Sequence, residues 1–302
     1  MNHAPSGLPN LLIIGAPRCG TTSLHDWLVA HPQISGSRRK ETFYMMDRDS
    51  CEFVERNNVH DHGLEGYARL FERCMDAAVR LESTTGYLYQ QTALELLPNL
   101  PSRPRFVTIL REPASRVLST FRYFQGHKAR LPRDMTFRGF IDAVDSGDPI
   151  VRNNEFLRDA IDHSRYVLPL ARWRERAGRE RIRIVLFEEL RRNASTLVPD
   201  LAEWCGVEKG FYESYAWPHR NESYEVRYPV LHAWVRSYVL PLVRSERIKR
   251  GLRGLYIAAA GRRARPSGED EAEVLAGLRE RFQQDNARLA SEWSLNLSSW
   301  SP

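Results

Sequence analysis

A glycine-rich turn near the start of the chain holds the residues best suited to chemistry. It reads Gly15-Ala-Pro-Arg-Cys-Gly20-Thr21-Thr22-Ser23 and follows the apolar run Leu11–Ile14. Glycines let backbone amides turn toward an anion, and the positive end of a following helix strengthens that attraction. The turn nearly fits the nucleotide phosphate loop GxxxxGK[ST], but Thr21 replaces the lysine that contacts the outer phosphates. The sequence therefore predicts an anion site whose basic residue is Arg18. The alternative is an ordinary turn whose glycines serve packing.

A second motif follows another apolar run, Arg105–Leu110. It reads Arg111-Glu-Pro-Ala-Ser-Arg116-Val-Leu-Ser119. An arginine offers a planar fork of donors to an anion, and a serine adds a hydroxyl donor. We therefore expect Arg111 and Ser119 to face one phosphate. The alternative interpretation is an ion pair at a helix start and a polar surface position.

Apolar runs and helical stretches alternate along the chain, which predicts an α/β fold with a parallel sheet flanked by crossover helices. Ligands bind such folds at the carboxyl ends of strands, which is where both motifs lie. The expected strands are 11–14, 78–81, 105–110 and 181–187. The expected helices are 21–28, 64–74, 114–124, 137–144, 166–177, 197–205 and the amphipathic stretch 269–293.

Together the two motifs resemble those of the sulfotransferase family that uses 3′-phosphoadenosine 5′-phosphosulfate (PAPS). The first resembles its 5′-phosphosulfate loop, and the second its 3′-phosphate motif RxPxxRxxSxxxxF, which ends here at Phe124. Two more segments are similar to those of the bacterial and heparan-type glycan branch: Lys40-Glu-Thr-Phe-Tyr-Met45 and Leu81-Glu-Ser-Thr-Thr-Gly-Tyr87. Further similarities are Ser164–Tyr166, Leu170, Trp173, Phe187–Leu190, and Phe282–Asn286 with Leu289 and Trp300.

The resemblance implies a P-loop-NTPase-like sulfotransferase fold and an enzyme that moves the sulfuryl group of PAPS to a hydroxyl or amine. The transfer would be direct and in line, as in phosphoryl transfer, with PAP as the desulfated product and no metal. Arg18 would stabilise the bridging oxygen of the leaving group, and Arg111 and Ser119 would hold the 3′-phosphate. The residues expected around the 5′-phosphosulfate are Arg18, Cys19, Gly20, Thr21, Thr22 and Ser23.

Glu41 corresponds to the catalytic base of the glycan branch, and Lys40 beside it would orient the carboxylate or compensate its charge. A carboxylate near a cationic loop normally has a lowered pKa, which weakens it as a base. His60 and His62 are the alternative bases, because the cytosolic branch of the family uses a histidine. If neither serves, Glu82 is the remaining candidate.

Two positions depart from the pattern of the relatives. Ser83 stands where the glycan enzymes carry a lysine near the acceptor. Their basic loop before the terminal helix is matched only loosely by Gly261–Arg265, in which Arg262 and Arg263 are candidate contacts to the adenosine 3′-phosphate.

Composition narrows the class of protein. The 302 residues include 44 Lys and Arg against 38 Asp and Glu, and no apolar run approaches the roughly 18 residues of a membrane-spanning helix. We see no export signal, so the expected location is the cytosol.

The four cysteines lack the spacing of a zinc or redox site, so we expect reduced thiols. We expect one domain over 1–302, with a loose leader at 1–9 and a helical C-terminal part at 229–302.

Basic residues gather in one stretch, 231–265, which has nine Arg and Lys and one acid. It is interpreted as a solvated basic helix, as an interfacial helix on anionic lipid, or as a site for an anionic acceptor. Such a local stretch does not favour nucleic-acid binding.

Two other functions remain open from the sequence: a nucleotide kinase or NTPase with a degenerate phosphate loop, and a non-catalytic nucleotide-binding protein. No readable pattern predicts the acceptor, which is a sugar, lipid, peptide or phenol, or the oligomeric state.

Overall fold

A computed structural model of the chain describes residues 7–217, 224–226, 261–263 and 269–300. The chain divides into two compact units. Unit 1 comprises residues 1–113, 165–219 and 282–302, and unit 2 comprises residues 114–164 and 220–281.

Unit 1 contains a five-stranded parallel sheet, which confirms the predicted α/β fold class. Its strands lie in the order β2-β3-β1-β4-β5. Their bounds are β1 Leu11–Gly15, β2 Ile34–Gly36, β3 Val79–Glu82, β4 Arg105–Leu110 and β5 Ile182–Leu186. Every residue of β1 is buried, as expected for a central strand covered on both faces.

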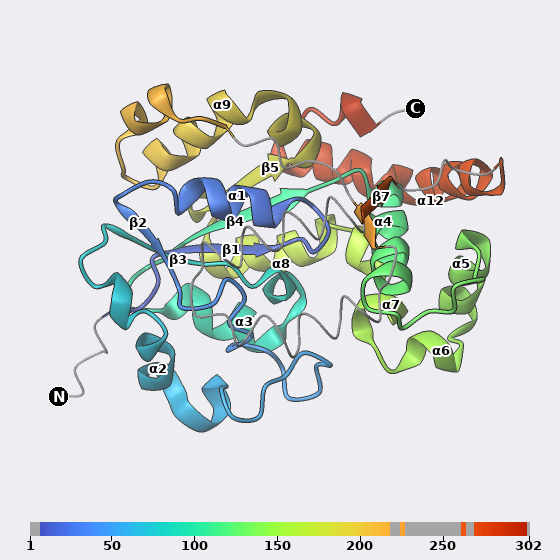
Figure 1. The fold of residues 1–302 in the computed structure, drawn as a ribbon, viewed down its shortest axis with the longest axis horizontal. Helices are drawn as coiled ribbons and strands as arrows, with labels where there is room; N and C mark the ends of the chain where they lie inside the picture. Colours follow the sequence, from blue (N-terminus) through green and yellow to red (C-terminus); the bar gives the residue numbers. More distant parts are fainter. Residues whose placement is uncertain (1–6, 218–223, 227–260, 264–268, 301–302) are drawn as a thin grey trace. The chain divides into compact units, whose positions relative to one another are not determined.

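Helices cover both faces of this sheet (Figure 1). One face carries α1 Thr21–Leu28 and α9 Phe187–Trp204, and the other carries α3 Gln91–Leu96 and α8 Val167–Ala177. In α1 the side chains of Leu24, Trp27 and Leu28 recur at helical spacing and are buried, so this stripe packs into the core. The other helical elements of unit 1 are α2 Val59–Arg69, η1 Glu72–Cys74, η2 Thr85–Tyr89, η3 Leu97–Asn99, η5 Arg179–Arg181, η6 Lys209–Ser214 and η9 Ser298–Trp300.

The strand order places a topological switch at β1. After β1 the chain builds β2 and β3 on one side, and it then crosses to build β4 and β5 on the other. All neighbouring strands are parallel, so their carboxyl ends share one edge of the sheet. A ligand site is expected at this edge, beside the switch.

Unit 2 is built mainly of helices. It holds most of α4 Pro113–Gly126, then α5 Phe137–Ser146, α6 Pro149–Arg152, α7 Glu155–Arg158 and η4 Asp162–Ser164. The ring of Phe121 packs on those of Phe137 and Phe140, with centroids 5.6 and 5.5 Å apart. The strands β6 Tyr224–Val226 and β7 Gly261–Arg263 pair antiparallel, and the first half of α12 Glu269–Trp293 also belongs to this unit.

Most predicted elements are present, and α1, β4 and α12 have the predicted bounds. Three elements differ from the prediction, and two of the differences have local causes. The strand β2 is three residues long, too short to show a period. The helix α9 begins at Phe187, ten residues before the predicted start, and it is kinked at Asn193, which breaks its periodicity. The short strand β7 lies in the C-terminal part, where no strand was expected.

The predicted leader and the basic stretch lie partly outside the described residues. Of the leader, Leu8 and Pro9 are buried. Of the stretch 231–265, only residues 261–263 are described. Within the described part of the chain, no helix combines the length and apolar character needed to cross a bilayer.

Candidate functional site

The glycine-rich turn joins β1 to α1 at the switch-point edge of the sheet. Gly20 caps the helix with a φ of 85°, and Arg18 has a φ of 71°. A Cβ at Gly20 would lie 2.8 Å from the ring of Phe187, so this position requires glycine both for its φ and for the close approach. The amides of Ser23 and Leu24 donate to the Gly20 carbonyl at 3.1 and 3.3 Å, and the amides before them point out of the N-terminus of α1. The turn therefore has the backbone geometry of an anion site.

The side chains of this turn differ in accessibility. Cys19 and Thr21 are buried, whereas Arg18 and Ser23 are half-buried and Thr22 is exposed. The predicted contacts of Cys19 and Thr21 to the 5′-phosphosulfate are thus restricted to their backbone amides. Arg18, Thr22 and Ser23 can also present side chains to a ligand.

Arg111 lies at the carboxyl end of β4, the strand next to β1. Its guanidinium carbon is 4.9 Å from the centroid of the Phe187 ring, the ring that excludes a side chain at Gly20. The carbonyl of Arg111 accepts a hydrogen bond from the buried Tyr166 hydroxyl at 2.9 Å. The next amide, of Glu112, donates to Glu188 Oε1 at 3.2 Å. The backbone at Arg111 is therefore fixed on both sides, and its side chain lies close to the turn.

Ser119 lies in unit 2, on α4, and it is half-buried. Its pairing with Arg111 of unit 1 stays a prediction. The second arginine of that motif, Arg116, is buried inside unit 2. Its Nη1 donates to Ser164 Oγ at 2.8 Å and to the Ala160 carbonyl at 3.2 Å, so its role is to tie α4 to the end of η4.

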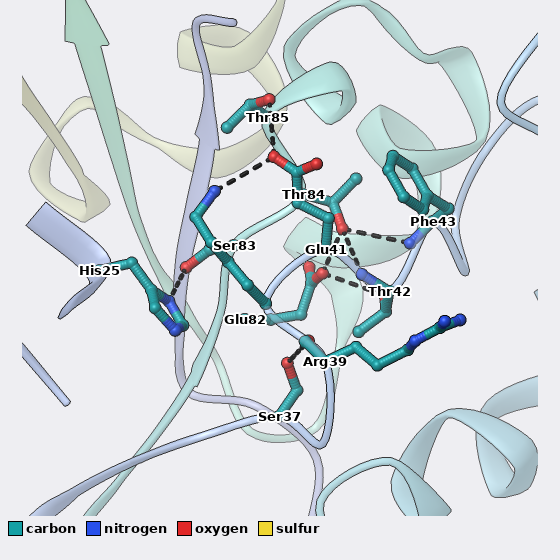
Figure 2. Close-up of polar contacts among 11 residues, drawn as sticks. His25, Ser37, Arg39, Glu41, Thr42, Phe43, Glu82, Ser83, Thr84 and Thr85 are labelled. Carbon is teal, nitrogen blue, oxygen red and sulfur yellow. Dashed lines mark hydrogen bonds and ion pairs between the residues drawn. The ribbon is translucent and has the colours of Figure 1, made fainter. Parts of the chain in front are cut away.

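Lys40 and Glu41 lie on an irregular segment between β2 and α2. Lys40 Nζ is 3.1 Å from Glu41 Oε1, and both side chains are partly exposed. The hydroxyl of Thr85, just after β3, donates to the same Glu41 oxygen at 3.4 Å (Figure 2). The pair is thus attached to the carboxyl end of β3, the other neighbour of β1.

His25 connects this pair with the helix of the glycine-rich turn. Burial is the main cause that lowers the pKa of His25 to about 4, and the charge of Lys40 contributes to this shift. Its Nδ1 lies 2.8 Å from the hydroxyl of Ser83, the residue that replaces a lysine of the relatives (Figure 2). The lysine position is therefore occupied here by a neutral Ser–His pair beside Lys40.

Glu82, which the sequence offered only as a fallback base, accepts the hydrogen bonds of several segments. Its carboxyl group is fully buried, and it accepts hydrogen bonds from the hydroxyls of Thr42, Thr84 and Tyr67. Burial raises its pKa to about 7, although these hydrogen bonds oppose the rise. The available signal was a run of three hydroxyl residues, 83–85, directly after a buried strand that ends in an acid.

The remaining predicted residues lie elsewhere. His60 and His62 are exposed, and His60 Nε2 lies 3.1 Å from the Met46 carbonyl. Arg262 and Arg263 belong to β7, where they pair with Glu225 and Tyr224 through the backbone; their side chains lie outside the described atoms. The four cysteines, all in the described part of the chain, form no disulfide.

Comparison with known families places most of the chain in one of them. The family model described as "Sulfotransferase domain" matches residues 8–216. This range includes the glycine-rich turn, the Lys40–Glu41 segment and both ends of the Arg111 motif.

Curated relatives are about a quarter identical to the chain over the residues that align with it. The human bifunctional heparan sulfate N-deacetylase/N-sulfotransferase 3 is 25% identical over 204 residues, which cover 66% of this chain and 22% of that protein. The Caenorhabditis elegans N-deacetylase/N-sulfotransferase 1 is 26% identical, with 71% and 24% covered. Mouse heparan sulfate glucosamine 3-O-sulfotransferase 6 is 26% identical, with 48% and 39% covered. The chain therefore spans less than half the length of each of these proteins.

Among solved structures, a sulfotransferase from Alicyclobacillus acidocaldarius has a similar fold. The TM-score is 0.67 at 20% sequence identity, and the match covers 97% of this chain and 98% of that one. This likeness supports the P-loop-NTPase-like arrangement of sheet and helices.

Proposed function

The chain belongs to the sulfotransferase domain family, and from this premise we propose that it transfers the sulfuryl group of PAPS to a hydroxyl or amine. One observation carries the proposal. Arg18 and Arg111 follow adjacent strands, β1 and β4, and the ring of Phe187 contacts both the Gly20 position and the Arg111 guanidinium. Two basic residues and a helix N-terminus thus lie at one edge of the sheet, which suits a donor with two anionic ends.

The donor would lie along this edge. Amides of residues 20–23 and the hydroxyls of Thr22 and Ser23 would hold the 5′-phosphosulfate. Arg111 would bind the 3′-phosphate, together with Ser119 as the family motif implies. Arg262 and Arg263 are proposed as further contacts on the resemblance alone, and the proposal includes no metal.

The chain's own residues suffice for in-line transfer. The bond from sulfur to the bridging phosphate oxygen breaks as the acceptor atom bonds to sulfur, and negative charge grows on the bridging oxygen. Arg18 would stabilise that charge. Glu41 would take the acceptor's proton, with Lys40 and Thr85 holding its carboxylate at 3.1 and 3.4 Å.

Neither alternative function gains support from the structure. A kinase or NTPase would need a cation at position 21 for the outer phosphates, and Thr21 is both uncharged and buried. A non-catalytic binder would have no use for a carboxylate held beside a lysine at this edge.

The names of the relatives favour a glycan acceptor, with lipids, peptides and phenols as further candidates. The Ser83–His25 pair carries less positive charge than a lysine at position 83 would. This difference favours an acceptor that is less anionic than heparan sulfate. Location in the cytosol, organisation as one domain and membrane contact through 231–265 stay predictions.

The decisive experiment combines binding with transfer. We expect calorimetry to detect PAP binding to the full chain, and sulfur-labelled PAPS to label at least one acceptor among sugars, lipids, peptides and phenols. Arg18→Ala should abolish label transfer while retaining PAP binding, because Arg18 acts on charge that develops only during transfer. Binding of ATP without binding of PAP would contradict the proposal.

A further inference from the structure

The segment that carries Glu41 needs an external support for its backbone. Residues 37–58 form neither helix nor strand. Four consecutive amides of this segment donate to side-chain hydroxyls. The pairs, with their donor–acceptor distances, are Thr42 and Phe43 to Thr84 Oγ1 (2.9 and 3.2 Å), Tyr44 to Thr42 Oγ1 (3.3 Å) and Met45 to the Tyr87 hydroxyl (3.0 Å).

The direction of every proton in this network follows from counting. A hydroxyl has one proton and two lone pairs. Thr84 Oγ1 accepts two amides, so its proton goes to Glu82 Oε1. Thr42 Oγ1 also donates to Glu82 Oε1, at 3.0 Å, so the Tyr87 hydroxyl 3.1 Å away must donate to Thr42. The hydroxyl protons of Thr42 and Thr84 therefore end on one oxygen of Glu82.

Glu82 is suited to be this common acceptor. It ends β3, it is fully buried, and its second oxygen accepts a hydrogen bond from the Tyr67 hydroxyl at 3.4 Å. A buried carboxyl group is costly unless its oxygens are hydrogen-bonded, and here both oxygens are. If the carboxyl group binds a proton on Oε2, Oε1 still accepts both threonine protons, so the network needs the oxygen rather than the charge.

The residues after Glu82 extend the support in two directions (Figure 2). Ser83 contacts His25 of α1 at 2.8 Å, and Thr85 donates to the Glu41 carboxylate at 3.4 Å. The run 82–85 therefore connects the helix of the glycine-rich turn, the backbone of residues 42–45 and the carboxylate of Glu41.

We propose that Glu82 is a positioning residue for Glu41: by accepting the protons of Thr42 and Thr84, it fixes the backbone on which Glu41 stands relative to α1. The inference rests on the proposed function, in which Glu41 is the base. Glu82 itself takes no proton from the acceptor.

Three variants of the full chain test this role: Glu82→Leu, Glu82→Gln and Thr84→Val. Glu82→Leu removes the acceptor, and Thr84→Val removes the hydroxyl that links this acceptor to the backbone. They should lower kcat by about a hundredfold, because a displaced catalytic group loses its alignment. PAP affinity should stay unchanged, and hydrogen exchange of the amides of residues 42–45 should accelerate. Glu82→Gln keeps an acceptor oxygen and should restore both slow exchange and most of the rate.

Thr108→Val is the matched control. Thr108 lies fully buried in β4, and its hydroxyl oxygen has no hydrogen-bond partner among the described residues. The same substitution there should change neither kcat nor exchange at 42–45. If Glu82→Leu does not fold, Thr84→Val still tests whether the hydroxyl link to Glu82 positions Glu41.

The outcomes separate this inference from the proposed function. Wild-type kcat in Thr84→Val, or parallel losses of kcat and PAP affinity, would overturn the positioning role. Unchanged exchange at residues 42–45 would overturn it as well. If the wild-type chain transfers no label at all, the proposed function fails, and exchange alone still shows whether Glu82 holds the segment.

Discussion

Two buried titratable side chains lie beside the glycine-rich turn, and burial favours the uncharged form of each. The pKa of Glu82 is raised to about 7, and that of His25 is lowered to about 4. A raised carboxyl pKa means that the folded chain binds more protons than the unfolded chain, so Glu82 stabilises the fold less as pH rises through this range. A lowered histidine pKa has the opposite sign, so His25 stabilises the fold less as pH falls from 6.5 toward 4.

We therefore predict opposite pH trends for two variants. The unfolding free energy of wild type minus that of Glu82→Gln should fall by up to about 3 kcal/mol between roughly pH 4.5 and pH 7, at about 1.4 kcal/mol per pKa unit. The unfolding free energy of wild type minus that of His25→Gln should instead rise between roughly pH 4 and pH 6.5. Chemical denaturation at a series of pH values measures both. A difference that stays flat for Glu82→Gln would show that its carboxyl group titrates normally.

At the scale of the element, the junction of β1 and α1 depends on one glycine. Gly20 combines a φ of 85° with an approach that would leave a Cβ 2.8 Å from Phe187, whose ring also contacts Arg111. A larger residue at position 20 must displace the Phe187 ring, and the Arg111 guanidinium would then lose its contact with that ring. The glycine thus links the turn to the end of β4 as well as shaping the turn.

Gly20→Ala should therefore destabilise the fold and weaken PAP binding together. Gly206→Ala is the matched control, because Gly206 has a φ of 87° but open space where a Cβ would stand. Both variants bear the strain of a positive φ, about 1–2 kcal/mol. Gly20→Ala should lose a further 1–3 kcal/mol, roughly the cost of overpacking. Equal stability losses in thermal unfolding, with equal PAP affinities, would show that the Phe187 contact has no consequence.

Across the whole of unit 1, three separate parts of the chain hold the backbone at Arg111, two directly and one through Glu188. Tyr166 precedes α8, Glu188 opens α9, and Trp300 lies near the C-terminal end in η9. The indole of Trp300 donates to Glu188 Oε2 at 3.0 Å, while Oε1 of Glu188 accepts the Glu112 amide at 3.2 Å. The C-terminal segment is thereby connected to a proposed donor-binding arginine nearly two hundred residues earlier in the sequence.

Trp300→Phe should lower PAP affinity about two- to twelvefold, the usual effect of one lost hydrogen bond of about 0.5–1.5 kcal/mol. The matched control is Trp293→Phe, because the indole nitrogen of Trp293 is buried and has no hydrogen-bond partner among the described residues. Calorimetry with PAP distinguishes the two. A loss of PAP affinity in Trp293→Phe as large as in Trp300→Phe would assign the effect to lost ring volume rather than to the Glu188 contact.

The sequence alone determined those features that depend on neighbours along the chain. The glycine-rich turn, Arg111 after β4 and the bounds of α1 and α12 were predictable, because a turn, a strand end and a helical period are each encoded within a few residues. The pairing of Lys40 with Glu41 was likewise readable from adjacent positions.

Only the tertiary structure decided what these residues contact. Glu82 was no more than a fallback base in the sequence, since its partners Thr42, Thr84 and Tyr67 come from three segments. Phe187 was expected to end a strand, yet it begins α9 and packs against Gly20 and Arg111. The packing of segments against one another determines burial and the direction of a hydroxyl proton. Residue spacing along the chain does not predict which segments pack together.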